Sequence, residues 1–377
     1  MELSRRHLLG GSALLLTPAR ALLSSALASE PVPTPAAAGK PIILCWNENP
    51  YGPSPAARAA IAQTIGHACR YPDDADLERL GARLAQREGV SRDHIVLGTG
   101  SGELLRALGL RCARVSGELL AAEPTYGELP EYARESGVTV RFVPVDAMLR
   151  HDLAAMHAAV TPRIRAVYLC NPNNPTGTAL TAREIGAFVD ALPQDVLTIV
   201  DEAYMDFTDA PGVRSVSELV KTGKRVIVLR TFSKIHGMAG VRCGYGIAPA
   251  DLASELAGLC MTSPNIFAMR AAVASLDDHA FLSDCRRRIL ASRARIKSEL
   301  GELGLRYADP QGNFVFFDTG VPLAQFSQYM QRERGILVGR RFPPYDTWCR
   351  ITIGTEPEVD NFLESLHAWR GTRRESA

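Results

Sequence analysis

The chain has 377 residues, of which 46% are hydrophobic and 22% charged, as is ordinary for a soluble globular protein. Its 42 basic and 41 acidic residues give a net charge of +1, which argues against nucleic acid or an acidic membrane surface as a partner. The eight cysteines are scattered singly, without a CxxC pair or a Cys/His cluster, so we expect neither a metal site nor a disulfide framework.

The N-terminal segment differs from the rest. Residues 4–9 (SRRHLL) resemble a twin-arginine export signal, and residues 26–28 (ALA) resemble a cleavage site for a signal peptidase. We therefore predict a signal peptide over residues 1–28, a flexible linker over 29–40, and an exported, periplasmic protein. The alternatives are a disordered basic tail on a cytoplasmic protein, or an uncleaved membrane anchor. Arg20 interrupts the apolar stretch and argues against the anchor.

From about residue 55 the chain alternates helical periodicity with short apolar runs. The runs at 94–98, 118–122, 139–142, 166–170, 197–200 and 226–229 are predicted strands, and residues 103–115 and 132–136 are predicted helical. Short, uniformly apolar strands separated by helices are typical of a buried, mostly parallel sheet. This part of the chain is predicted to be an α/β domain.

Beyond residue 255 the pattern changes. A long region rich in Ala, Arg and Leu is predicted to be helical as far as Leu303. Strands are then expected at 313–318, 335–338 and 348–353, which together indicate a smaller α+β domain. The fold class is therefore α/β, with a large domain followed by a small one.

Lys234 follows directly after the predicted strand at 226–229 and the residues RTFS. The carboxyl ends of strands in an open α/β sheet form the ligand crevice, and a desolvated lysine beside another cation becomes a usable nucleophile. A lysine in a Ser-Lys pair is by itself more often a surface residue. Here Thr231, Ser233 and Arg242 stand close in the sequence and are suited to binding a phosphate. Glycines 237, 240, 244 and 246 would let the backbone pass close to a flat ligand.

Asp201 and Tyr204 follow the predicted strand at 197–200. An aspartate here can pair with a protonated pyridine nitrogen, and the tyrosine can donate to a phenolic oxygen. The alternative is an aspartate that only caps a helix.

Two turns are further candidates for binding a ligand. The segment NPNNPTG (171–177) follows the strand at 166–170, and turn chemistry alone would explain most such sequences. The turn GTGSG (98–102) joins a strand to a helix, whose N-terminal amides favour a phosphate. Close packing is the alternative reading of these glycines, and the G-x-G-x-x-G fingerprint is incomplete.

Taken together, these motifs match a known family. The chain resembles the fold-type I, class I/II aminotransferases that depend on pyridoxal phosphate, and most closely their histidinol-phosphate aminotransferase branch. The motifs that carry the resemblance are NENPYGPSP (47–55), YPD (71–73), GTGSGE (98–103), PTYG (124–127), NPNNPTG (171–177), DEAY (201–204), TFSKIHGMAGVRCGYG (231–246) and RITIGT (350–355).

The resemblance implies a role for each matching residue. Lys234 would bind pyridoxal phosphate covalently and move the substrate's α-proton, with Asp201 on the ring nitrogen and Tyr204 on the phenolic oxygen. Residues implied to bind the cofactor are Gly100, Ser101, Gly102, Tyr126, Asn174, Asp201, Tyr204, Thr231, Ser233, Lys234 and Arg242. Those implied for the substrate are Asn49, Arg340 and Arg350. Without the resemblance, Arg350 would be taken for an exposed residue on an edge strand.

The resemblance also implies a homodimer, in which Tyr51 reaches the neighbouring subunit's cofactor. It divides the chain into an N-terminal arm with part of the small domain (41–70), a large cofactor-binding domain (71–255), a connecting helical region (256–300) and a small domain (301–377). The branch usually has an acidic residue at Gly102. The Phe-Pro-Pro context after Arg341 is also unusual, so either Arg340 or Arg341 contacts a substrate side chain, or the two are a solvated pair.

The function implied is amino transfer between an L-amino acid, or an amine like histidinol phosphate, and a 2-oxo acid. A decarboxylase or another lyase on the same fold is the alternative, because cofactor motifs do not decide which bond breaks. A non-catalytic scaffold would most simply have lost Lys234 or Asp201, and both are present. Export conflicts with histidinol phosphate as the substrate, because histidine biosynthesis is cytoplasmic. We therefore leave the substrate open among aromatic, imidazole-bearing and basic amino acids.

Overall fold

The computed structural model describes residues 40–374. The predicted signal peptide (1–28) and all but the last residue of the predicted linker (29–40) lie outside the described residues. Among the helices within the described range, none has the length and apolar character needed to cross a bilayer.

A seven-stranded sheet forms the centre of the large domain, with the strand order β2-β8-β7-β6-β5-β3-β4. Strand β8 runs antiparallel to β2 and β7, and the other neighbouring pairs are parallel. All six strands predicted for this region are confirmed, with small differences at their ends. The bounds are β2 (Ile95–Gly98), β3 (Glu118–Glu123), β4 (Val140–Pro144), β5 (Ile164–Cys170), β6 (Leu197–Asp201), β7 (Val226–Thr231) and β8 (Gly244–Ile247).

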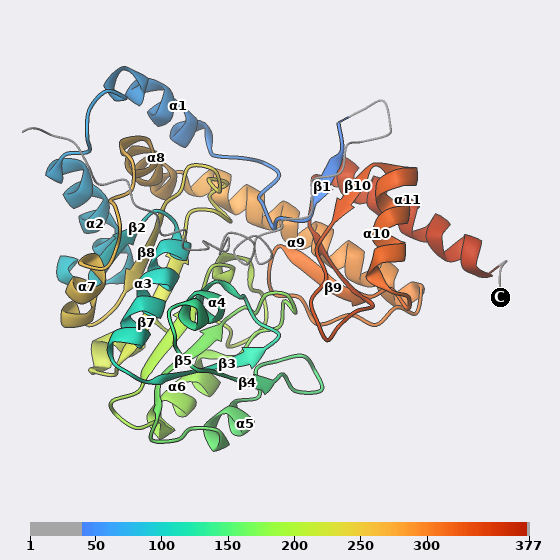
Figure 1. Ribbon diagram of the computed structural model, residues 1–377. Coiled ribbons are helices and arrows are strands. Elements are labelled where there is room, and N and C mark those ends of the chain that lie inside the picture. The colour runs from blue at the N-terminus through green and yellow to red at the C-terminus, as the bar shows by residue number, and fades with distance from the viewer. Residues whose placement is uncertain (1–39, 375–377) are drawn as a thin grey trace, which may run out of the picture.

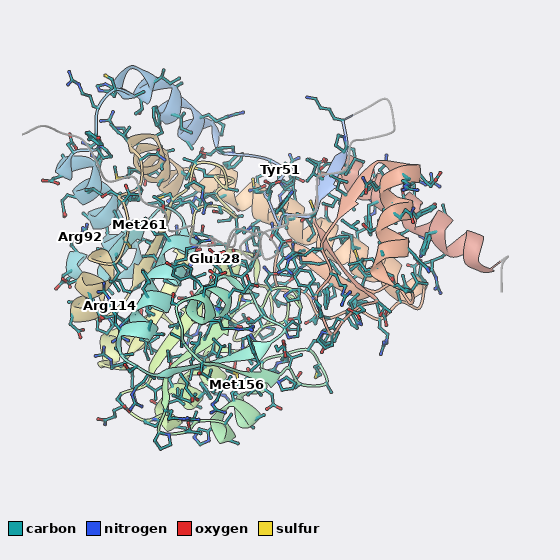
Figure 2. All side chains as sticks on the ribbon, in the orientation of Figure 1. Tyr51, Arg92, Arg114, Glu128, Met156 and Met261 are labelled. Carbon is teal, nitrogen blue, oxygen red and sulfur yellow. The ribbon has the colours of Figure 1, made fainter. Side chains whose placement is uncertain are left out.

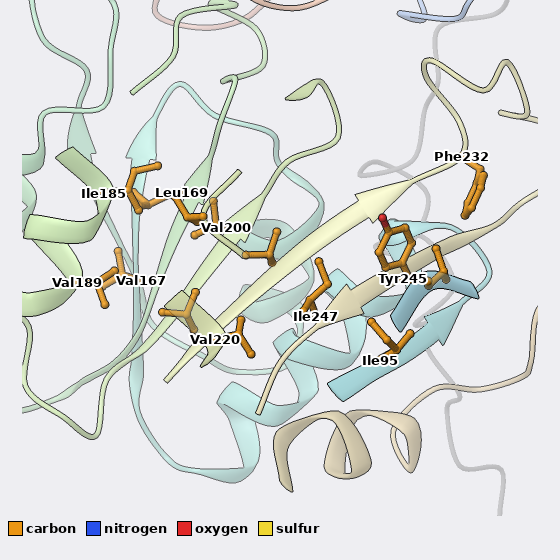
Figure 3. Close-up of a cluster of buried hydrophobic side chains, with 14 of the residues drawn as sticks. Ile95, Val167, Leu169, Ile185, Val189, Val200, Val220, Phe232, Tyr245 and Ile247 are labelled. Carbon is orange, nitrogen blue, oxygen red and sulfur yellow. The ribbon is translucent and has the colours of Figure 1, made fainter. Parts of the chain in front are cut away.

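Helices cover both faces of this sheet, which explains why its strands are apolar throughout. Successive side chains of β5 alternate between two hydrophobic clusters, with Val167 and Leu169 in one and Tyr168 in the other. Figure 3 shows Val167 and Leu169 beside Ile185 and Val189 of α6. The helices on this face are α1 (Pro55–Thr64), α2 (Asp74–Glu88), α5 (Leu153–Ala158), α6 (Ala182–Ala191) and α8 (Ile266–Asp277). Those on the other face are α3 (Ser101–Arg114), α4 (Glu128–Glu135) and α7 (Ala250–Ala257).

The small domain holds two separate strand pairs. Its elements are β1 (Ile42–Leu44), parallel to β10 (Ile336–Val338), β9 (Phe314–Asp318), antiparallel to β11 (Trp348–Thr352), and the helices α10 (Leu323–Arg334) and α11 (Glu356–Arg374). Figure 1 shows β1 beside the C-terminal elements, with the long helix α9 (His279–Glu302) running between the two domains. The three strands predicted here are confirmed, and the domain boundaries drawn from the sequence stay predictions.

Candidate active site

A cavity of about 1000 Å³ lies where the carboxyl ends of the parallel strands meet the small domain. Asp201 is the last residue of β6, Thr231 is the last of β7, and Ser101 begins α3 directly after the turn that follows β2. Parallel strands end at the same edge of a sheet, so residues distant in sequence are brought together there. Predicted site residues that line the cavity are Ser101, Gly102, Tyr126, Asn174, Asp201, Tyr204, Thr231, Ser233, Lys234, Arg242, Arg340 and Arg350.

The amine of Lys234 points into this cavity from the segment after β7. Its Nζ donates hydrogen bonds to the carbonyl oxygens of Asn47 (3.0 Å) and Trp46 (3.3 Å) and lies 5.5 Å from the centre of the Tyr204 ring. Burial, followed by the nearby charge of Arg350, lowers the pKa of Lys234 to about 8. The amine is therefore partly unprotonated near neutral pH, as a nucleophile or general base requires.

The carboxylate of Asp201 is buried at the end of β6. It accepts hydrogen bonds from the Tyr168 hydroxyl (3.3 Å) and the Ala203 amide (3.1 Å), and none of the side chains that the structure describes forms an ion pair with it. Burial raises its pKa to about 6. A buried anion without a cationic partner is poised to bind a cation brought by a ligand.

Hydroxyl and guanidinium donors also meet in the wall of the cavity. The Thr231 hydroxyl donates to Ser233 Oγ (2.9 Å), which also accepts from Arg242 Nη1 (3.4 Å). The first turn of α3 begins beside them at Ser101, and a first helical turn leaves amide groups without intrahelical partners. This set of donors matches the oxygens of a phosphate.

Gly100, which the resemblance implies to bind the cofactor, is not among the residues that line the cavity. Its φ is 88°, and a Cβ added there would lie 2.4 Å from Arg242 Nη2. The glycine therefore leaves room for the Arg242 guanidinium against the turn, so it acts by shaping the turn.

A chain of hydrogen bonds joins Arg350, Asn174 and Tyr204. Arg350 Nη1 donates to Asn174 Oδ1 (2.6 Å), while Asn174 Nδ2 (3.4 Å) and Asn47 Nδ2 (3.1 Å) donate to the Tyr204 hydroxyl. Arg350 is only 8% exposed, so the reading of it as an exposed edge residue is wrong. The carbonyl of Cys45 accepts from its Nη2 (2.7 Å), and the buried guanidinium lines the cavity.

Asn49 and Tyr51 are absent from the cavity wall, although the resemblance implies roles for both. Asn49 Nδ2 donates to the carbonyl of Ile235 (2.8 Å), and its Oδ1 accepts from the amide of Tyr51 (3.1 Å), so the side chain fixes the main chain. The Tyr51 ring lies 5.3 Å from the guanidinium carbon of Arg288 in its own chain, and its hydroxyl is buried. Figure 2 shows Tyr51 away from Glu128 of α4, which does line the cavity.

Several residues of the cavity wall have no role that was predicted from the sequence. Asn47 has a φ of 55° and contacts both Lys234 and Tyr204, and its only sequence signal is its place in the NENPYGPSP motif. Other lining residues without a predicted role are Trp46, Glu103, Arg106, Glu128, Met261 and Phe342. Glu128 and Met261 come from separate parts of the chain (Figure 2).

Among the glycines after Lys234, Gly237 and Gly244 have a role other than the predicted approach to a flat ligand. Gly244 and Gly246 belong to β8, which the sequence did not reveal because glycine interrupts its apolar run. A Cβ at Gly244 would lie 2.3 Å from the amide nitrogen of Ser101, and one at Gly237 would lie 2.1 Å from the carbonyl oxygen of Gly52. These glycines allow segments of the backbone to pack against one another.

The residues of the cavity fit pyridoxal phosphate. Thr231, Ser233, Arg242 and the start of α3 offer donors for its phosphate, and Asp201 offers an anion for its ring nitrogen. Lys234 offers an amine for its aldehyde, and the cavity is large enough for a cofactor with a substrate.

Comparisons with known proteins agree with this geometry. The family model described as "Aminotransferase class I and II" matches residues 39–366. A histidinol-phosphate aminotransferase of Moorella thermoacetica is 37% identical over 328 residues, covering 86% of this chain and 84% of the relative. An aromatic amino acid aminotransferase of Rhodococcus jostii is 38% identical over 326 residues, covering 85% of this chain and 88% of the relative.

A solved structure supports the same assignment. The histidinol-phosphate aminotransferase of Sinorhizobium meliloti in complex with pyridoxal 5'-phosphate is 27% identical, with a TM-score of 0.78, and the match covers 88% of this chain and 92% of that one. The chain therefore belongs to the class I and II aminotransferases and is a fold-type I transaminase that depends on pyridoxal phosphate.

Proposed function

We propose that this transaminase uses Lys234 as its covalent attachment point and proton carrier, Asp201 as the partner of the cofactor's ring nitrogen, and Arg350 as the binding site of the substrate's α-carboxylate. The observation that carries the proposal is that one cavity holds the amine with its lowered pKa, the unpaired buried carboxylate and the buried guanidinium. Amino transfer from an L-amino acid to a 2-oxo acid needs all three.

Each residue has a defined task in the reaction. Pyridoxal phosphate supplies an electron-withdrawing ring that stabilises negative charge at the substrate's α-carbon. Asp201, ionised above its pKa of about 6, would hold a proton on the ring nitrogen and so keep the ring electron-withdrawing. The free amine of Lys234 would take the proton from the substrate's α-carbon and deliver it to the cofactor's former aldehyde carbon. In the second half of the exchange it would move a proton in the opposite direction. The Tyr204 hydroxyl, fixed by two amide donors, is placed to donate to the phenolic oxygen.

Arg350 and Asn174 orient the substrate. A guanidinium binds a carboxylate through two parallel hydrogen bonds, which fixes the direction of the α-carbon substituents. The bond from Arg350 to Asn174 and the bond to the Cys45 carbonyl hold the guanidinium in place before a substrate arrives. An amine without an α-carboxylate, such as histidinol phosphate, would gain nothing from this contact. We therefore favour an L-amino acid as donor, among the aromatic, imidazole-bearing and basic classes.

Visible absorption of the purified protein tests this function. Adding amino acids one at a time to protein loaded with pyridoxal phosphate is expected to convert the cofactor's band to that of the pyridoxamine form, with at least one donor. Lys234→Ala should abolish the conversion, and Lys221→Ala, which removes a lysine paired with Glu218 outside the cavity, should leave it intact. Release of CO₂ without the pyridoxamine form would instead favour the decarboxylase reading.

We further propose that the protein is a homodimer whose partner covers the cavity rim. Two rim side chains, Trp46 (63% exposed) and Met261 (93% exposed), are large and apolar, and Tyr71 is 96% exposed. Tyr51 packs within its own chain, so Tyr71 is the better candidate to reach across the interface. Sedimentation analysis should give a dimer, and Met261→Asp should favour the monomer. A monomeric wild type with full activity would rule this proposal out.

The proposal that the protein is exported rests mainly on residues 1–28. All eight cysteines are free thiols, which suits a protein that folds in the cytoplasm before export. Cell fractionation should find the protein in the periplasm and shift it to the cytoplasm when Arg5 and Arg6 are both replaced by lysine. A wild-type protein that stays in the cytoplasm would remove the conflict with a biosynthetic substrate.

A further inference from the structure

Glu202 is a buried carboxylate beside Asp201, and the proposed reaction gives it no task. Its Oε2 lies 2.9 Å from Nε of Arg230, whose side chain is 11% exposed. Its other oxygen accepts a hydrogen bond from the amide of Val216 (2.8 Å). Neither member of this ion pair lines the cavity. Any part that the pair has in the reaction therefore passes through neighbouring residues.

The two members of the pair belong to adjacent strands. Strands β6 and β7 are parallel and place Asp201 opposite Leu229, so the next residues, Glu202 and Arg230, also stand opposite each other. The amide of Glu202 donates to the Leu229 carbonyl (2.9 Å). The ion pair therefore ties the two strands together one residue beyond the end of β6, where the strand ends would otherwise be free to separate.

The pair lies on the other face of the sheet from the residues proposed to bind the cofactor. Side chains of a strand alternate between its two faces, so Glu202 and Arg230 share the face of Val200 (Figure 3), which α2 and α6 cover. Asp201 and Thr231, each one position away, point to the opposite face and line the cavity. Each member of the pair is thus joined through the main chain to one residue of the site.

The other charged side chains near the pair have partners of their own. The Tyr245 hydroxyl, opposite Arg230 on β8, donates to Glu88 of α2 (2.7 Å). Arg87 lies 3.6 Å from both Glu88 and Asp206. These contacts leave the two members of the pair to balance each other.

The balance of this pair matters to Asp201. Burial first, and the charge of Glu202 among the further causes, raise the pKa of Asp201. Burial also raises the pKa of Glu202 itself, and Arg230 opposes that shift. A buried ion pair adds little stability compared with apolar side chains of the same size, but it requires one geometry. Such a pair suits a place where two strand ends must keep a fixed separation.

We propose that Glu202 and Arg230 are positioning residues for the cofactor. By joining the ends of β6 and β7, their ion pair holds Asp201 and Thr231 at the separation that the ring nitrogen and the phosphate of one molecule require. This inference rests on the proposed roles of Asp201 and Thr231. Without the pair each contact would remain but their separation would vary, so a ligand that needs both contacts would bind more weakly.

Two probes separate the spacing of these contacts from the contacts themselves. The compound 4-deoxypyridoxine 5'-phosphate has the ring and the phosphate but no aldehyde, so it cannot react with Lys234. Inorganic phosphate occupies the phosphate end alone, and its affinity follows from competition with the ring compound in equilibrium titrations of the full-length apoprotein. Glu202→Gln and Arg230→Gln should each weaken binding of the ring compound about tenfold and change that of phosphate less than about twofold.

The two variants also distinguish position from charge. Glu202→Gln leaves a positive charge unpaired and Arg230→Gln leaves a negative one, so a purely electrostatic effect on an anionic ligand would have opposite signs in the two proteins. Loss of the fixed separation has the same sign in both. The double variant leaves no charge unpaired and serves if a single variant does not fold. It should show the same selective loss, of about threefold.

Arg111→Gln is the matched control. Arg111 of α3 lies 2.9 Å from Glu255 of α7, and its side chain is also 11% exposed, but neither residue lines the cavity. This variant should lower the melting temperature, as the other variants do, and leave the affinities for both probes unchanged.

Three results would overturn the inference. One is an unchanged affinity for the ring compound in the variants of the pair, and another is an equal loss for the two probes, which would mean that the pair only supports the local structure. The third is a change of opposite sign in Glu202→Gln and Arg230→Gln. If the wild type bound the ring compound no more tightly than phosphate, the proposed roles of Asp201 and Thr231 themselves would be rejected.

Discussion

Arg350 donates a 2.6 Å hydrogen bond to the side-chain oxygen of Asn174, although 176 positions separate the two residues. Arg350 belongs to β11 of the small domain, and Asn174 to the turn that follows β5 of the large domain. The bond therefore joins the domains at the place where a substrate would be held. The site depends on how the domains pack, and its residues can be tested one by one.

Arg350→Lys should raise the KM for amino acids about ten- to a hundredfold with a smaller change in kcat, because lysine keeps the charge but loses the two-pronged contact. An amine without an α-carboxylate should be far less affected. Steady-state kinetics with both kinds of donor measures the difference. Equal losses for the two would show that Arg350 acts on the protein structure rather than on the carboxylate.

Attachment of the cofactor should depend on pH through Lys234. The free amine is the nucleophile, so below its pKa of about 8 the rate falls as protons bind, and above it the rate is constant. Rapid-mixing absorbance of the apoprotein with pyridoxal phosphate should show a rise of about tenfold per pH unit that levels off near this value. A rise continuing to the ordinary lysine value of 10.5 would contradict the lowered pKa.

Asp201→Asn should lower kcat about 10²- to 10³-fold, because the neutral amide cannot stabilise a protonated ring nitrogen. The same change should stabilise the apoprotein. Burial raises the pKa of Asp201 from 3.8 to about 6, so its folded state loses stability as the pH rises through that window. Above pH 6 the variant apoprotein should have a higher melting temperature than the wild-type apoprotein. The difference between the two should shrink as the pH falls towards 3.8. A less stable variant at all pH values would contradict this reading.

Gly100→Ala should weaken the affinity for pyridoxal phosphate, because the added methyl group would displace the Arg242 guanidinium. Gly137→Ala is a matched control, since Gly137 has a similar φ (85° against 88°) and an added Cβ there meets nothing within 4 Å. Both variants should lose about 1–3 kcal/mol of unfolding free energy, because both glycines have a positive φ that an alanine rarely adopts. Equilibrium titration with the cofactor should show weaker binding in Gly100→Ala alone.

Most of the large domain could be predicted from the sequence. Its strands are short apolar runs between helices, since both faces of the sheet are buried and each strand needs apolar side chains in two directions. Strand β8 was missed because Gly244 and Gly246 remove the apolar signal from half of its positions. Gly244 is required by the backbone at the start of α3, and Gly246 by side chains of β2 and β7, all of them distant in the sequence.

The sequence by itself determined the chemistry of the site, because Lys234, Asp201 and Arg242 follow strand ends or lie in motifs that only a few chemical tasks require. Only the tertiary structure decided that Arg350 is buried and that Arg340 shares the ring of Phe342. It also decided that Asn49 and Tyr51 lie outside the cavity wall. The physical reason is that local patterns encode burial and turns, whereas the spacing of charges in a cavity is set by contacts between segments that fold from different parts of the chain.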